Sequence, residues 1–247
     1  MQEIQLSARL QAVLHAIPSG GCLADIGSDH AYIPCQAIRA GIVSRAIAGE
    51  VREGPFRQSV LNVRAYGLET SVDVRFGDGL DVIAGGEADT IVIAGMGGEL
   101  IVHLLERGSA KIEKASLVLQ PNIREPLCRG WLAAHGWLIE RETIVEEASH
   151  FYEIIRARKA GSGECAELSE SELLLGPQLL IQKQTIFLKK WNRRANKLRQ
   201  ILGQLRAVKH NDAASERRHS CFRELSMIEA VLNGQATAAQ TSQKAKE

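Results

Sequence analysis

Residues 22–30, CLADIGSDH, decide the fold expected for this chain. A short run of small and apolar residues reaches Asp25, Gly27 opens a turn, and a helix-forming stretch follows at 31–40. Apolar runs of this length, bounded by Gly and Asp, are typical of buried strands. A strand that leads through a tight turn into a helix is the first half of a βαβ unit. We therefore expect a parallel sheet that contains 22–27.

The same alternation continues to about residue 158. Further strands are predicted at 46–50, 72–78, 89–95, 116–121, 137–147 and 152–159, with helices at 55–66, 100–106 and 126–135. Strands that alternate with helices give right-handed crossovers and a mostly parallel sheet covered on both faces. The last two strands follow one another without a helix, so we expect an antiparallel edge. The pattern predicts an α/β fold of the Rossmann-like, class I methyltransferase type. Many nucleotide-binding proteins have the same strand pattern.

Charge is distributed unevenly along the chain. The formal net charge is only +1, yet residues 181–223 contain twelve Lys and Arg residues against two acidic ones. An asymmetry of this size indicates a body and a basic arm with different partners. Composition otherwise excludes pervasive disorder and a small disulfide scaffold, because 45% of the residues are hydrophobic and the five cysteines are scattered.

The arm has helical periodicity. Apolar residues recur seven apart within 173–208, and 221–232 repeats the helical spacing after a turn at 210–215. The sequence therefore predicts a basic helical hairpin or coiled coil. The expected domains are 1–160, a helical hairpin at 168–235 that follows the linker 160–171, and a flexible tail at 236–247. The same seam serves an intramolecular hairpin or an intermolecular coil, so monomer and dimer both remain open, the monomer being the simpler expectation.

Acidic residues end three successive strands. Asp25, Glu50 and Asp78 follow the first, second and third strands, and the carboxyl ends of parallel strands meet where such sheets bind ligands. The chain lacks GxGxxG, so a dinucleotide site is not expected. Carboxylates suit the ammonium group, ribose hydroxyls and adenine amine of S-adenosylmethionine. Each motif alone is more often a turn, and it is their order that favours this cofactor.

Five segments carry a family resemblance: DIGSDHAYIP (25–34), AGEVREGP (48–55), GDGL (77–80), IAGMGGELI (93–101) and LQPN (119–122). They resemble the bacterial tRNA adenine-22 N1-methyltransferase family (TrmK), closely over residues 6–158 and loosely in the basic tail. The resemblance implies methyl transfer from S-adenosylmethionine to N1 of an adenine in the D-arm region of tRNA. It also implies that the cofactor site contains Asp25, Gly27, Ser28, Asp29, Glu50, Asp78 and Gly79. Neighbouring residues of the same motifs complete the candidate cofactor site: His30, Val51, Gly95 and Met96.

Chemistry at adenine N1 needs alignment and a counter-charge. N1 carries its own lone pair and the product is cationic, so a nearby carboxylate would stabilise the transition state. Asp29 is the first candidate, although it can instead hold the cofactor's ammonium. Gln120 and Asn122 are candidates for contacting the Watson–Crick edge of a flipped adenine, with helix capping as the alternative for Asn122. Tyr32 can stack on the flipped base or simply pack.

The basic arm supplies candidate tRNA contacts. The expected phosphate-binding residues are Lys189, Lys190, Arg193, Arg194, Lys197 and Arg199. No metal site and no membrane span are expected, and reduced cysteines favour a cytoplasmic location. The competing functions are methylation of another RNA or a small molecule, and noncatalytic RNA binding by a coiled-coil interaction protein.

Overall fold

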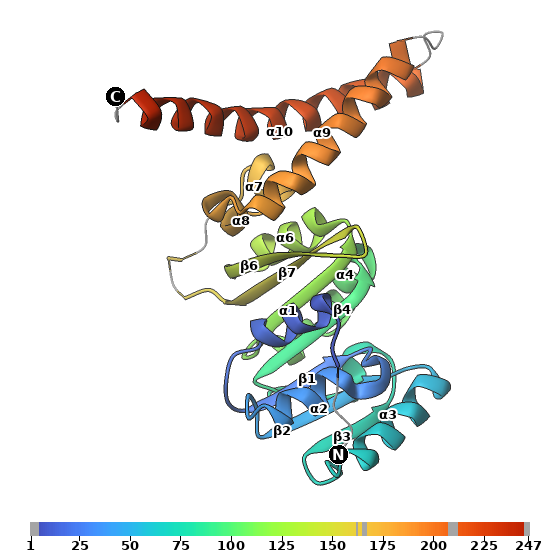
Figure 1. The fold of residues 1–247 in the computed structure, drawn as a ribbon. Helices are drawn as coiled ribbons and strands as arrows, with labels where there is room; N and C mark the ends of the chain where they lie inside the picture. Colours follow the sequence, from blue (N-terminus) through green and yellow to red (C-terminus); the bar gives the residue numbers. More distant parts are fainter. Residues whose placement is uncertain (1–4, 162, 165–166, 207–211, 245–247) are drawn as a thin grey trace.

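A seven-stranded mixed sheet forms the centre of the computed structural model, which describes residues 5–161, 163–164, 167–206 and 212–244 (Figure 1). The spatial order of the strands is β3-β2-β1-β4-β5-β7-β6. Their bounds are Cys22–Ile26 (β1), Arg45–Glu50 (β2), Val72–Phe76 (β3), Thr90–Gly97 (β4), Ser116–Ile123 (β5), Trp137–Glu147 (β6) and His150–Lys159 (β7). The strand order changes direction between β1 and β4: β2 and β3 follow on one side of β1, and β4 and β5 lie on the other. Folds of this class bind ligands at such a switch point.

Pairing confirms the mostly parallel sheet and its antiparallel edge. Strands β1 to β5 pair in parallel, and β7 runs antiparallel to both β5 and β6. The expected antiparallel edge is therefore confirmed: β6 and β7 pair with each other at this side of the sheet, with β7 next to β5 and β6 outermost. The tight turn between them, Ala148–Ser149, has positive φ at both residues.

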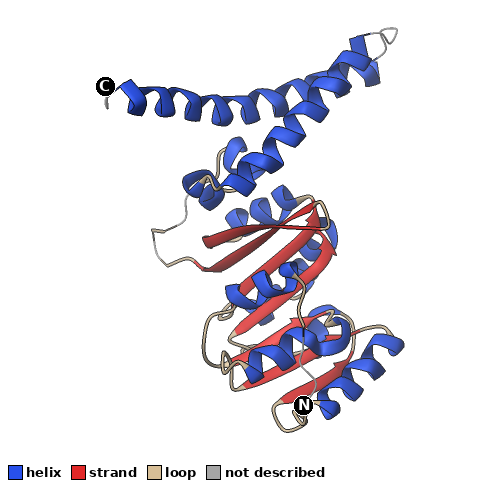
Figure 2. Ribbon diagram, in the orientation of Figure 1, coloured by secondary structure: helices blue, strands red, loops and turns tan. Residues whose placement is uncertain are grey.

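Helices cover both faces of the sheet (Figure 2). In β1, Leu23 packs with one face, and Ala24 and Ile26 pack with the other, as the two-residue period of a strand requires. One layer contains α1 (Ala8–Ala16), α2 (Tyr32–Arg39) and α3 (Glu53–Ala65); the other contains α4 (Gly98–Arg107), α5 (Ser109–Ile112) and α6 (Glu125–Ala134). Short 3-10 turns, η1 (Asp29–Ala31) and η2 (Gly79–Val82), follow β1 and β3.

The C-terminal region is helical but differs from the single first helix expected over 173–208. It contains α7 (Glu170–Leu175), α8 (Pro177–Gln182), α9 (Thr185–Arg206) and α10 (Asp212–Lys244). The chain bends at Gly176, which has a φ of 88°, and again at Lys183, which has a φ of 42°. Pro177 adds to the first bend because its ring prevents continuation of the preceding helix. Ile181, assigned to the apolar seam, is consequently 77% exposed.

Helices α9 and α10 pack against each other and extend away from the sheet (Figure 1). Trp191, Ala195 and Leu198 of α9 are buried with Leu225 and Ile228 of α10, and Ile144 of β6 joins this cluster. The helices are thus in apolar contact with each other and with the sheet edge. The predicted helix end at residue 208 and turn start at 210 lie outside the described residues. Helix α10 continues to Lys244, through most of the segment expected to be a flexible tail, and the flexibility stays a prediction.

Candidate functional site

A cleft of about 460 Å³ opens at the carboxyl ends of β1, β2 and β4. Its lining contains eight of the residues singled out from the sequence: Asp25, Gly27, Asp29, Tyr32, Glu50, Val51, Gly95 and Met96. Six residues that were not site candidates from the sequence also line it: Arg9, Leu10, Ile33, Arg52, Ala94 and Leu100. The expectation that these strand ends share one cleft is confirmed.

Asp25 lies at the bottom of the cleft and is only 6% exposed. The hydroxyl of Ser28 donates to its Oδ2 at 2.5 Å. Burial raises the pKa of Asp25 to about 6, and nearby Glu50 adds to the rise while the Ser28 hydrogen bond opposes it. A buried carboxylate without a cationic partner is costly to ionise, so this site favours a positively charged ligand.

Glu50, at the end of β2, is 3% exposed. The backbone amides of Val51 and Arg52 donate to its Oε1 at 3.1 and 2.8 Å, and the Arg52 Nε lies 3.4 Å from the same oxygen. All these donors use one carboxylate oxygen. The side chain is therefore held in one orientation with Oε2 available to accept hydrogen bonds from a ligand.

The loop after β1 is held against β2. The amides of Gly27 and Ser28 both donate to the carbonyl of Gly49 at 2.8 Å. Gly27 has a φ of 74°, and a Cβ there would lie 2.2 Å from the Met96 side chain, so a glycine is required where β1 and β4 approach. Asp29 follows with a 65% exposed side chain at the mouth of the cleft.

His30 and Ala31 both have positive φ, at 65° and 55°. Asn62 of α3 donates to the carbonyl of His30 at 2.9 Å, which holds this unusual backbone in place. The His30 ring lies 5.6 Å from the Tyr32 ring, and its Nε2 lies 3.4 Å from the Asp29 carboxylate. His30 is not among the residues that line the cleft, so its cofactor contact stays a prediction.

Gln120 is fully buried and its amide is already engaged. Its Oε1 accepts from Arg9 Nη1 at 2.7 Å and from the Gly95 amide at 3.1 Å, and its Nε2 donates to Asn122 Oδ1 at 3.1 Å. Asn122 in turn donates to the Gly95 carbonyl at 2.8 Å. These two amides therefore fix the turn at Gly95, where β4 carries a bulge and φ is 77°. Asn122 does not cap α6, whose N-cap is Arg124.

Among the cleft residues that were not candidates from the sequence, Arg9 makes the contact with Gln120. Its amide donates to Glu147 at 2.8 Å, and its guanidinium lies 5.5 Å from the centre of the Tyr152 ring. Helix α1 thus closes one side of the cleft. A single arginine in an N-terminal amphipathic helix carries no sequence signal that distinguishes it from a surface residue.

Asp78 and Gly79 do not line this cleft. Asp78 follows β3, its side chain is 56% exposed, and it accepts from Arg107 Nη1 at 2.7 Å. Gly79 has a φ of 57°, and a Cβ there would lie 2.5 Å from Leu104. The role of Asp78 in binding the cofactor stays a prediction that requires the Arg107 contact to change or to be shared.

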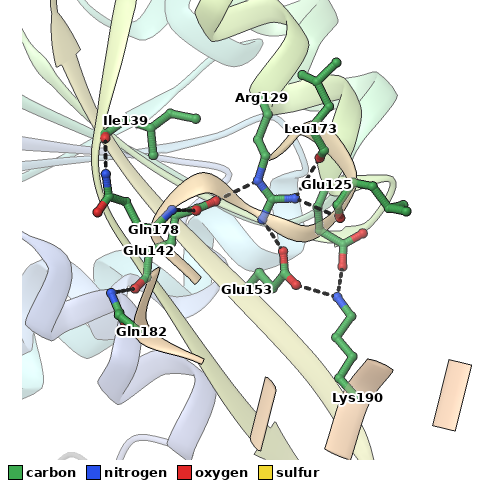
Figure 3. A network of polar contacts seen from close by, with 10 residues as sticks. Glu125, Arg129, Ile139, Glu142, Glu153, Leu173, Gln178, Gln182 and Lys190 are labelled. Carbon is green, nitrogen blue, oxygen red and sulfur yellow. Dashed lines mark hydrogen bonds and ion pairs between the residues drawn. The ribbon is translucent and has the colours of Figure 1, made fainter. Parts of the chain in front are cut away.

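A second group of buried charges lies where the helical region meets the sheet (Figure 3). Arg129 of α6 donates from Nε to Glu142 at 2.6 Å and from Nη2 to Glu153, and all three side chains are fully buried. Lys190 of α9 donates to Glu153 and to Glu125, each at 2.7 Å. This junction network, Glu125, Arg129, Glu142, Glu153 and Lys190, connects α6, β6, β7 and α9.

The pKa values in the junction network reflect competition between burial and pairing. Burial acts to raise the pKa of Glu153, but Lys190 and Arg129 together hold it below its ordinary value. Burial is the main influence on Glu142 and keeps its pKa raised, although Arg129 and the Gln178 amide, which donates to its Oε2 at 2.9 Å, both oppose the rise. For Lys190, burial acts to lower the pKa, and Glu153 and Glu125 more than reverse this. Lys190 therefore keeps its charge between two carboxylates, and its expected contact with a tRNA phosphate stays a prediction.

Other cations of the arm have carboxylate partners too. Lys189 pairs with Glu146 at 2.6 Å, Arg194 with Glu224 at 2.5 Å, and Arg199 with Glu229 at 2.7 Å. The positive charges of these α9 residues are therefore balanced by carboxylates of α10 and of the β6–β7 hairpin. Their contact with tRNA stays a prediction.

Three further features of the described part of the chain concern its cysteines, metal binding and membrane spans. Burial raises the pKa values of Cys35 and Cys128 to about 12, as expected for packing residues, and Cys165 lies outside the described residues. Among the described residues, no group of His, Cys, Asp or Glu is arranged to hold a metal ion. None of the helices searched in those residues has the length and apolar character to span a membrane.

Comparison with known proteins gives a consistent result. The family model TrmK, tRNA (adenine(22)-N(1))-methyltransferase, matches residues 23–228. A relative of that name from Bacillus subtilis (strain 168) is 45% identical over 210 residues, which cover 83% of this chain and 87% of the relative.

Solved structures agree over the fold as well. The crystal structure of the B. subtilis M1A22 tRNA methyltransferase TrmK is similar with a TM-score of 0.85 and 39% identity, covering 93% of this chain and 99% of that one. A putative tRNA (m1A22) methyltransferase from Streptococcus pneumoniae, in complex with S-adenosyl-L-methionine, has a TM-score of 0.82 and 38% identity, covering 92% and 100%.

Proposed function

This chain belongs to the TrmK family of tRNA (adenine(22)-N(1))-methyltransferases, and on that premise we propose that the cleft at the ends of β1, β2 and β4 binds S-adenosylmethionine and receives the target adenine. The reaction is methyl transfer to N1 of adenine 22 in tRNA, and S-adenosylmethionine is the methyl donor. The residues that bind donor and acceptor are argued below from the contacts in the cleft.

The observation that carries the site assignment is a pair of buried acids without a buried cationic partner in the described structure. Asp25 and Glu50 are 6% and 3% exposed and lie in one cleft, and the nearest cation, Arg52, is 70% exposed. A cationic ligand relieves the cost of ionising them. S-adenosylmethionine, when bound, supplies a sulfonium-activated methyl group and carries an ammonium and a ribose diol, so its chemistry fits this donor set.

We assign the ribose diol to Glu50 and the amino-acid end to the region of Asp25 and the 27–29 turn. Glu50 offers Oε2 because the backbone holds Oε1. Gly27 and Asp29 of this turn both line the cleft with Asp25. Asp78, which follows β3 outside the cleft lining and whose carboxylate contacts Arg107, is assigned to the adenine amine.

Asp29 is the residue we place next to the methylated base. Its carboxylate is exposed at the mouth of the cleft, where it can stabilise the positive charge that forms on adenine. Tyr32 lines the same mouth and offers a surface on which an extruded base can stack. Contact with the cofactor ammonium is the alternative role for Asp29.

Gln120 and Asn122 act as positioning residues in this proposal. Both amide groups are engaged with each other, with Arg9 and with Gly95, so they are not free to contact the base directly. Their role is to hold the Gly95–Met96 turn, which forms the wall of the cleft. Alignment of the reacting atoms depends on such fixed walls, since orientation can contribute about 7–11 kcal/mol to lowering a barrier.

The basic arm is assigned to tRNA binding, and a cytoplasmic location is proposed because tRNA is the substrate. Exposed cations contact phosphates without reading sequence. The division into a methyltransferase domain, 1–160, and a helical region, 168–235, is kept as a proposal, with separate apolar clusters in support.

The test is transfer of labelled methyl groups from S-adenosylmethionine to unmodified tRNA transcripts. N1-methyladenosine mapped to position 22 is the expected product. A transcript in which that adenine is replaced by guanine should accept no label. Transfer to another position or to a different molecule would overturn the substrate assignment, and absence of cofactor binding would overturn the site.

A further inference from the structure

A groove of about 550 Å³ lies between the start of α6 and the middle of α9. Asn122, Glu125 and Pro126 contribute one wall, and Trp191 and Lys197 contribute the other. The groove adjoins the cofactor cleft, because Asn122 lines the groove and donates at 2.8 Å to the carbonyl of Gly95, which lines the cleft. A strand that passes through the groove therefore reaches the mouth of the cleft.

The cations around this groove differ in how far their charge is compensated. Lys190 is neutralised by Glu125 and Glu153, Arg194 by Glu224, and Arg124 by Glu99. Arg193 donates at 2.8 Å to a backbone carbonyl, that of Ser149, which leaves its positive charge uncompensated. Lys197 has no hydrogen bond or ion pair to any residue that the structure describes.

Arg193 and Lys197 are four residues apart, one turn of α9, and both line the groove. Two like charges at this spacing on a helix repel each other. The groove's two acids do not offset them, because Glu125 and Glu224 already hold Lys190 and Arg194. An anion bound between these two side chains would remove the repulsion.

We propose that this groove binds the RNA backbone immediately next to the methylated adenine, with Arg193 and Lys197 on a phosphate. The inference rests on the proposed function and adds to it the place where the flanking strand enters. Phe151 and Pro126 in the groove wall provide apolar surface for the sugar or base of that nucleotide. A phosphate fixed here holds the strand while the neighbouring base is turned out of the stack, a step that costs free energy because stacking and pairing are lost.

The experiment compares Arg193→Gln, Lys197→Gln and the double variant with the matched control Lys114→Gln. Lys114 is exposed before β5, at the opposite end of the strands from the cleft. Affinity for unmodified tRNA is measured by fluorescence anisotropy over a range of salt concentrations, and S-adenosylmethionine affinity by calorimetry. Each groove variant should bind tRNA about 5- to 10-fold more weakly, and the slope of log affinity against log salt should fall by about 0.7–0.9 per lost phosphate contact.

Two results separate this inference from the proposed function. If the groove variants keep the wild-type affinity and salt slope, the groove does not bind phosphate and the inference is wrong, whatever the wild-type protein methylates. If the slope falls in the groove variants but the wild-type protein transfers no methyl group to tRNA, the groove remains an RNA site and the proposed function fails. Loss of cofactor affinity in the same variants would indicate general damage and would also count against the inference.

Discussion

Two sets of buried carboxylates occupy this molecule, and they differ in their partners. In the junction network, Glu142 and Glu153 are fully buried against Arg129, and Lys190 adds a second cation. In the cleft, Asp25 and Glu50 are almost as buried but have only hydroxyl, amide and exposed arginine contacts. The first set is electrostatically complete within the chain. The second becomes complete when a cationic ligand binds, which is why burial alone does not distinguish a structural acid from a ligand-binding one.

The largest expected effect is on the free energy of unfolding, when Arg129 is removed from the junction network. Arg129→Met leaves Glu142 and Glu153 buried without their shared cation, which typically destabilises a protein by about 3–5 kcal/mol. Urea denaturation followed by circular dichroism measures the change. Arg158→Met is the matched control, because that arginine pairs with Glu164 at the surface and should cost about 0–1 kcal/mol. Equal effects in the two variants would show that burial of the network has no special energetic role.

The next effect should appear in binding rather than in stability. Glu50→Gln keeps the size of the side chain but removes the charge that we assign to the ribose hydroxyls, and hydrogen bonds to charged groups contribute about 1.5–3 kcal/mol. S-adenosylmethionine should therefore bind about 10- to 100-fold more weakly in calorimetry, with an unchanged unfolding midpoint. Glu146→Gln, which removes a carboxylate of an exposed pair with Lys189, should leave cofactor binding unaltered. Unchanged cofactor affinity in Glu50→Gln would remove Glu50 from the site.

Cofactor affinity should depend on pH because of Asp25 in the cleft. Because the pKa of Asp25 is raised from 3.8 to about 6, this carboxyl is protonated in the free protein below pH 6 and must ionise to hold a cation. Cofactor affinity should fall about tenfold for each pH unit below 6, since one pKa unit corresponds to about 1.4 kcal/mol. Asp25→Asn should bind weakly with no such slope. A wild-type profile that stays flat between pH 5 and 7.5 would contradict this role.

The same raised pKa has a consequence for the stability of the free protein. A carboxyl with a raised folded-state pKa contributes stability that is fully present below the unfolded pKa of 3.8 and is lost as pH rises through about 6. Asp25→Asn should accordingly be more stable than the wild-type protein at pH 7.5 and lose that advantage toward pH 4. Thermal unfolding at several pH values without cofactor measures this difference.

The smallest effect is expected at the third strand-end acid. Asp78 is 56% exposed and pairs with Arg107, so Asp78→Asn should weaken cofactor binding only severalfold and leave stability within about 1 kcal/mol. Calorimetry on Asp78→Asn and Glu50→Gln together ranks the two sites. A larger loss at Asp78 than at Glu50 would reverse the view that burial without a cation identifies the principal acid.

Strand ends were predictable from the sequence because they depend on local signals. Short apolar runs ended by Asp25 and Glu50 placed both acids in one cleft, as observed. The break at Gly176 had a signal in its Gly-Pro dipeptide, which the heptad pattern obscured. A Cβ on Gly176 would lie 2.7 Å from both Arg129 and Glu142, so this glycine also allows the turn to close over the junction network.

The junction network itself could not be predicted. Arg129, Glu153 and Lys190 are separated by 24 and 37 residues, and charged residues in amphipathic segments normally face solvent. The network also bears on the removal of residues 168–247, the helical region and the tail. That deletion takes away Lys190 and the Leu173 carbonyl that accepts from Arg129, and so it should destabilise the body as well.

The position of β7 has a consequence for the order in which the chain can fold. Strand β6 leaves the ribosome first, yet its partner in the sheet is β7, which is made later and lies between β6 and β5. Newly made β6 therefore lacks its native partner until the chain has turned back through Ala148–Ser149. The junction network needs acids from both strands and Lys190 from α9, so it can be completed only after the sheet's own residues have been made.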